Sequence, residues 1–141
     1  MVEKFIRYDQ SYIGEFAMRR LLLSMLILCG LHPTAFADQL TAPSFWKNNL
    51  GSELRITGVG VNGTLRGTFT NYAKDYSCKG IPYPISGRTS AVITTFKVNF
   101  VKCRTVTTWQ GTVQGLAFPA PWSLEYNGQI TPGFDFFYRI N

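Results

Sequence analysis

The chain has 141 residues, a formal net charge of +6 and 45% hydrophobic residues. Over residues 38–141 the charges are spread singly, which excludes a basic stripe of the kind that binds nucleic acid. The chain also has a single histidine, His32, and no adjacent pair of carboxylates, so we expect no enzyme, no metal site and no cofactor.

The first 37 residues predict processing rather than a folded domain. Residues 1–17 have no convincing element and are interpreted as a non-structural extension, with either Met1 or Met18 as the true start. In residues 18–37 two arginines precede an apolar run too short to span a membrane, and an Ala-Phe-Ala motif follows. This order is typical of a secretory signal peptide, so we expect a secreted or periplasmic protein without a membrane segment after cleavage. Cys29 suggests a lipoprotein, but Leu28 before it is too large for the usual lipobox.

Residues 38–141 carry the pattern of one all-β domain. Helical periodicity is missing, and short alternating runs are separated by Gly, Pro and Asn. Eight runs are predicted, at about 44–49, 52–59, 64–71, 83–89, 91–101, 104–114, 121–126 and 134–140. Eight strands joined by short loops favour an antiparallel up-and-down β-barrel, because closure removes the exposed edges. A barrel of this size has room for side chains or for one small ligand.

The inward faces of these strands follow from the alternation of residues. In the second run, Ser52, Leu54 and Ile56 are predicted to face inward, and Asn62-Gly63 after it is a hairpin signal. In the fifth run, Val92 is predicted to share a face with Phe96 and Phe100. The link 127–133 before the last run is predicted to be a loop.

The stretch Thr105–Gly111 alternates most strictly and carries an unusual face. Period 2 puts Thr105, Thr107, Trp109 and Gly111 on one side, so that two hydroxyls lie in line with an indole. Such a wall can form hydrogen bonds and enclose a small ligand. The alternative is an ordinary strand in which Thr serves β-propensity and Trp109 belongs to the core.

Two cysteines remain after residue 37, Cys78 and Cys103. In an oxidising compartment the default is a disulfide, which would contribute about 3–4 kcal/mol through the loop that it closes. The alternative, a catalytic thiol, lacks a partner base because His32 leaves with the signal peptide.

Several polar residues fall on faces predicted to be internal. Burying such groups costs a few kcal/mol each unless they find partners, so a cluster implies mutual bonding, water or a ligand. These residues are Asn48, Ser52, Asn71, Thr105, Thr107 and Asp135. The alternatives are that Asn48, Ser52 and Asp135 only serve turns.

Five motifs in order resemble the avidin/streptavidin family of biotin-binding barrels. They are Trp46-x-Asn48-x-Leu50-Gly51-Ser52, Gly67-Thr68-Phe69, Thr107-Thr108-Trp109-x-Gly111, Trp122-x-Leu124 and Gly133-x-Asp135-x-Phe137. The segment Cys78-x-x-x-Pro82-Tyr83-Pro84 together with Cys103 is similar to the disulfide-containing bacterial members, which are typically dimers.

The resemblance implies biotin as the partner and a role for each residue. Asn48 and Ser52 would donate to the urea oxygen of biotin, while Asp135 and Asn71 would accept from its two N–H groups. Thr107 would face the thioether sulfur, and Thr105 would contact the valerate carboxylate. The walls would be Trp109, Trp122 and Leu124; the alternative is that the two tryptophans belong only to the core.

Three departures from the family pattern stand out. The family usually has Tyr at the position of Phe69 and a wall Trp at the position of Phe100. The link 127–133 lacks the Trp by which tetrameric members reach the neighbour's site, so we expect a homodimer. A different apolar or sugar-like ligand is the alternative function, and a purely structural domain would need no polar interior.

Overall fold

The computed structural model describes residues 38–141. The predicted extension over 1–17 and the predicted signal peptide over 18–37 therefore lie outside the described residues. Within residues 38–141, no helix is long and apolar enough to cross a membrane.

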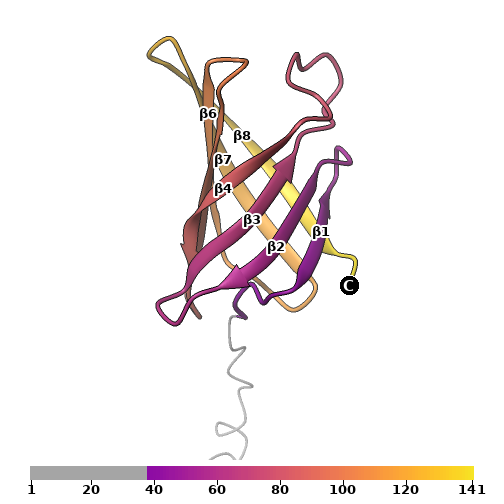
Figure 1. The fold of residues 1–141 in the computed structure, drawn as a ribbon, viewed down its shortest axis with the longest axis vertical. Helices are drawn as coiled ribbons and strands as arrows, with labels where there is room; N and C mark the ends of the chain where they lie inside the picture. Colours follow the sequence, from indigo (N-terminus) through magenta and orange to yellow (C-terminus); the bar gives the residue numbers. More distant parts are fainter. Residues whose placement is uncertain (1–37) are drawn as a thin grey trace, which may run out of the picture. The chain divides into compact units, whose positions relative to one another are not determined.

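Eight antiparallel strands pair in chain order, and the last pairs with the first, which closes the sheet into a barrel (Figure 1). The strands are β1 (Ser44–Asn48), β2 (Glu53–Val59), β3 (Thr64–Thr70), β4 (Pro82–Thr89), β5 (Thr94–Phe100), β6 (Thr105–Gly111), β7 (Ala117–Tyr126) and β8 (Gln129–Arg139). The predicted eight-stranded up-and-down barrel is confirmed.

Strand alternation fills the interior of the barrel as predicted. On and before β2, Ser52, Leu54 and Ile56 are buried, while Glu53 and Arg55 face outward and form an ion pair. The largest buried side chains are aromatic, and each contributes about 1.5–3 kcal/mol by leaving water. They are Trp46, Phe69, Phe96, Phe100, Phe118 and Phe137. A contiguous aromatic core therefore occupies much of the barrel.

The boundaries of the last two strands differ from the prediction. β7 and β8 each begin about four or five residues earlier than expected, and they meet at a tight turn, Asn127–Gly128. Both turn residues have positive φ, 49° and 77°, a conformation that Asn and Gly adopt readily. The predicted loop over 127–133 is thus mostly strand. Val92 is also misplaced by the prediction, since it lies in a bend before β5 and is 75% exposed.

A disulfide fastens the longest loop of the barrel to a neighbouring turn. Cys78 in the β3–β4 loop is bonded to Cys103 in the β5–β6 turn, as predicted. The neighbouring Tyr76 hydroxyl lies 2.7 Å from the Thr105 hydroxyl, and its ring packs edge-on against Phe100. The loop is therefore held in place over one end of the barrel.

Candidate ligand-binding site at one end of the barrel

A cavity of about 230 Å³ lies inside the barrel at the end covered by the β3–β4 loop. Its lining combines inward-facing residues of the strands with residues of two loops. The lining residues are Asn48, Leu50, Ser52, Phe69, Asn71, Ala73, Lys74, Asp75, Tyr76, Thr107, Trp109, Trp122, Leu124 and Asp135. Nine of the eleven residues predicted for the ligand site are among them.

Asp135 is the charged group of the cavity interior. It lies in the middle of β8, opposite Ala120 of β7, and is only 4% exposed, so it is not a turn residue. Trp109 Nε1 donates to its carboxylate at 2.7 Å. Burial raises the pKa of the Asp135 carboxyl, and hydrogen bonds from Trp109, Asn48 and Trp122 counteract only part of that rise. Asp135 is therefore a buried acceptor whose charge is incompletely compensated.

Asn48 and Ser52 enclose the β1–β2 turn next to Asp135. The Asn48 side-chain oxygen accepts from the backbone N–H groups of Leu50 and Ser52, at 3.1 and 2.7 Å. Asn48 therefore does serve the turn, and its amide nitrogen is left to donate toward Asp135 or the cavity. The Ser52 hydroxyl oxygen accepts from Tyr72 N at 2.9 Å, which leaves its proton free to be donated. Both residues thus keep donors available at the closed end of the cavity.

Asn71 and Thr107 extend the polar lining. The Asn71 side-chain oxygen accepts from Ala73 N at 2.7 Å and retains a second lone pair for another donor. Thr107 is buried on the inward face of β6, two residues before Trp109, as the alternation predicted. Asn71 directly follows β3 and Thr107 lies on β6, and the barrel brings them to one cavity.

Aromatic rings form the apolar wall. The Trp109 ring lies 4.8 Å from Phe69 and stacks on Phe96 at 4.9 Å with an interplanar angle of 9°. Trp122 is only partly buried and lies across Gly133, where any Cβ would overlap with its indole. Gly133 therefore allows Trp122 to lie flat at the cavity.

Phe100 and Thr105 are the two predicted site residues that do not line the cavity. Phe100 is fully buried behind it and supports the rings of Phe69 and Tyr76. The Thr105 hydroxyl is already hydrogen-bonded to that of Tyr76. Tyr76, which lines the cavity, is therefore the residue through which Thr105 is connected to it.

Five lining residues were not predicted as site residues: Leu50, Ala73, Lys74, Asp75 and Tyr76. Leu50 belongs to the β1–β2 turn, and the other four belong to the β3–β4 loop. No alternation marks a loop as inward-facing. The sequence held one indirect signal for the position of this loop: the predicted disulfide ties Cys78, in the loop, to the turn just before Thr105.

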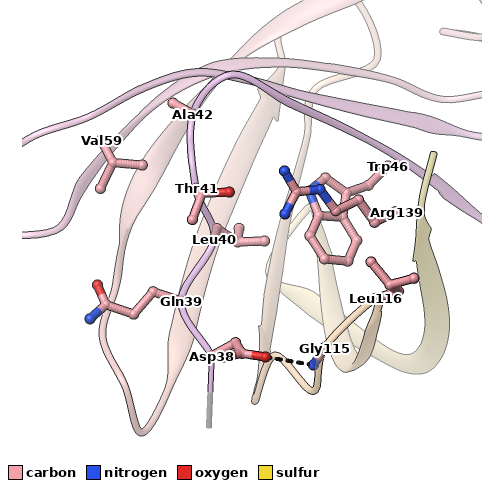
Figure 2. A pocket seen from close by; sticks show the side chains of 10 residues that line it. All are labelled: Asp38, Gln39, Leu40, Thr41, Ala42, Trp46, Val59, Gly115, Leu116 and Arg139. Carbon is pink, nitrogen blue, oxygen red and sulfur yellow. Dashed lines mark hydrogen bonds between the residues drawn. The ribbon is translucent and has the colours of Figure 1, made fainter. Parts of the chain in front are cut away.

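A second, larger hollow of about 800 Å³ lies at the other ends of the strands. Figure 2 shows residues 38–42 on one side of it and Trp46, Leu116 and Arg139 on the other. Its charged groups are already bonded within the chain: the Asp38 carboxylate accepts from Gly115 N, and Arg139 Nε donates to Asn141 O. This hollow lacks the buried, available polar groups of the first cavity.

Metal binding finds no support in the described part of the chain, where no group of three or more His, Cys, Asp or Glu side chains could hold an ion. The donor set of the cavity instead suits a small organic molecule. It offers neutral donors and one carboxylate at the closed end, aromatic faces along the wall, and a loop at the mouth.

Residues 36–119 match the Avidin family. Afifavidin of Afifella pfennigii is 29% identical, with 79% of each chain covered. Among solved structures, the bradavidin2–biotin complex has a TM-score of 0.68 and 42% identity, covering 72% of this chain and all of the other. The rhizavidin–biotin complex has a TM-score of 0.66 and 29% identity, covering 72% and 93%. The match to the family spans more than half of the chain and covers the barrel from β1 to the start of β7, and the protein therefore belongs to the avidin family.

Proposed function

We propose that this protein binds biotin, without catalysis and without a cofactor, in the cavity that contains Asp135. The observation that carries the proposal is the buried, incompletely compensated Asp135 carboxylate beside free donors on Asn48 and Ser52. A urea presents an acceptor oxygen next to two N–H donors, which is the complement of this set. Similar barrels solved as biotin complexes support the same ligand.

Each residue then has a role in binding. Ser52 and Asn48 donate to the urea oxygen, while Asp135 and Asn71 accept from the N–H groups. Thr107 faces the sulfur, and Trp109, Trp122 and Leu124 enclose the apolar part of the bicycle. Phe69 contributes a ring but no hydroxyl. Because these groups are held by strand pairing before the ligand arrives, little ordering is required on binding, which favours affinity.

The best test measures thermal unfolding of the mature protein with biotin and with lipoic acid. Lipoic acid carries the same valerate chain on a sulfur-containing ring but has no urea. A ligand that binds only the folded state stabilises it by about 4 kcal/mol at a thousandfold excess over Kd. We expect biotin alone to raise the Tm. An equal rise with lipoic acid would favour the alternative, a site for apolar ligands in general.

We also infer that the protein is exported after removal of residues 18–37. The Ala-Phe-Ala motif ends at residue 37, and Asp38, the first residue that the structure describes, donates a backbone hydrogen bond from its N to Val113 O at 3.1 Å. Cleavage at this point would leave the barrel complete. The Cys78–Cys103 disulfide also suits an oxidising compartment.

A homodimer is the third part of the proposal. The outer face of β8 carries an apolar row, here called the β8 strip, made of Ile130, Pro132, Phe134, Phe136 and Tyr138. Ile130, Phe134 and Tyr138 are 70%, 56% and 50% exposed. A continuous exposed row of this kind favours burial against a second copy of the chain.

A further inference from the structure

The mouth of the cavity carries a positive charge that none of the roles above uses. Lys74 lies in the β3–β4 loop and is the single cationic residue among those that line the cavity. It is exposed, and it takes part in neither of the ion pairs of residues 38–141, which join Glu53 to Lys47 and to Arg55. Its ammonium group is therefore available to a ligand.

Of the two carboxylates that line the cavity, Asp75 lies at the mouth next to Lys74 and Asp135 lies at the other end. Asp135 is buried among Trp109, Asn48 and Trp122, where an anionic group of the ligand would be repelled. An elongated ligand with one polar neutral end and one carboxylate is therefore oriented by the protein, with its carboxylate toward the mouth. Thr105, the residue predicted to meet that carboxylate, is outside the lining and is bonded to Tyr76.

We propose that Lys74 binds the anionic end of the ligand, so that the site prefers a free carboxylic acid over its neutral amide. This inference rests on the proposed biotin-binding function and adds a charge-selective contact to it. Asp75 also lines the mouth and opposes Lys74 in sign.

The expected change in affinity is modest because the Lys74 side chain is exposed to solvent. An ion pair at a solvent-exposed position is screened by water and salt, and its loss changes affinity by about two- to fivefold. A charge at the mouth also accelerates the approach of an oppositely charged ligand, and that acceleration falls as ionic strength rises. Both effects require a charged ligand, so a neutral analogue of biotin serves as the control.

The experiment measures Kd and association rate of biotin and of neutral biotinamide, for the wild type and Lys74→Gln, at low and high salt. We expect Lys74→Gln to weaken biotin about two- to fivefold at low salt and to leave biotinamide unchanged. Lys74→Arg should restore the preference for biotin. Lys79→Gln, on the same loop but outside the cavity lining, should change neither ligand.

Two results would overturn the proposal: equal weakening of both ligands by Lys74→Gln, which would indicate a loop effect, or no change in either. In both cases biotin binding itself would stand. Failure of the wild type to bind either ligand would instead remove the proposed function, and the Lys74 contact with it.

Discussion

The Asp135 carboxylate accepts a hydrogen bond from Trp109 inside the protein, and we propose that it also accepts one from the ligand. Asp135→Asn keeps an oxygen for Trp109 Nε1 but replaces the other carboxylate oxygen by an amide. One biotin N–H would then lose its acceptor, which we expect to weaken binding by about 2–3 kcal/mol, or about 30- to 150-fold. Titration calorimetry measures this, and unchanged affinity would remove Asp135 from the site.

Asp135→Ala is the informative companion variant. It leaves the buried Trp109 Nε1 without its 2.7 Å partner, so it should also lower the stability of the free protein, by about 1–3 kcal/mol. Asp135→Asn should not do so. Comparing the two by denaturant unfolding separates the ligand role of the carboxylate from its internal role.

The raised pKa of Asp135 predicts a dependence on pH. Because its folded pKa lies above the unfolded value of 3.8, its contribution to stability is present below that value and is lost as pH rises through the folded pKa. Biotin N–H groups need the carboxylate, so biotin affinity should fall as pH drops through the same range. Asp135→Asn should lose this pH dependence of affinity, and a wild-type affinity that is flat with pH would contradict the assignment.

At Phe69 we expect a substitution to strengthen biotin binding rather than weaken it. It lines the cavity and is 1% exposed, and no hydroxyl is present where the family usually has Tyr. If its ring edge faces the urea oxygen, Phe69→Tyr adds a donor worth about 1–2 kcal/mol. We expect slower biotin dissociation in a chase experiment. Unchanged or faster dissociation would indicate that the surrounding rings leave no space for the oxygen.

Among the elements, lining residues on strands or directly next to a strand were predictable, whereas those further inside the turns and loops were not. Period 2 fixes which side of β6 faces inward, and the structure places Thr107 and Trp109 on that side, as predicted. Lys74 and Tyr76 lie in a loop, where position depends on the disulfide and on packing against Phe100. Thr105 was assigned to the correct face, but a loop side chain occupies the space before it, and alternation carries no information about that.

Gly133 provides a test of how two paired strands shape the site. A Cβ at this position would overlap with the indole of Trp122 across the β7–β8 pair. Gly133→Ala should displace the indole and weaken biotin by about 1–3 kcal/mol, the usual cost of overpacking. Gly58→Ala is the matched control, because its Cβ would meet Arg66 at an ordinary 3.8 Å. Equal affinities for the two variants would show that Trp122 does not need its present position.

For the whole molecule, the open question is what covers the outside of the barrel. The interior is filled by aromatic residues and the cavity, while the β8 strip remains exposed on the described chain. The Phe136 and Tyr138 rings lie 4.9 Å apart, and Pro119 and Pro121 of β7 pair beside Phe136 and Phe134. The apolar surface thus extends across two strands, as an interface between subunits requires.

Phe134→Lys tests whether this surface joins two copies. Phe134 lies in the middle of the strip and is 56% exposed, so a lysine there should leave the barrel folded. In a dimer, however, it would bring a charge into a desolvated interface, which costs several kcal/mol. By light scattering at micromolar concentration we expect a dimer mass for the mature wild type and a monomer mass for Phe134→Lys. Val61→Lys, at a fully exposed residue of the β2–β3 turn, should remain dimeric. A dimer unaffected by Phe134→Lys would place the interface elsewhere, and a tetramer mass for the wild type would contradict the dimer itself.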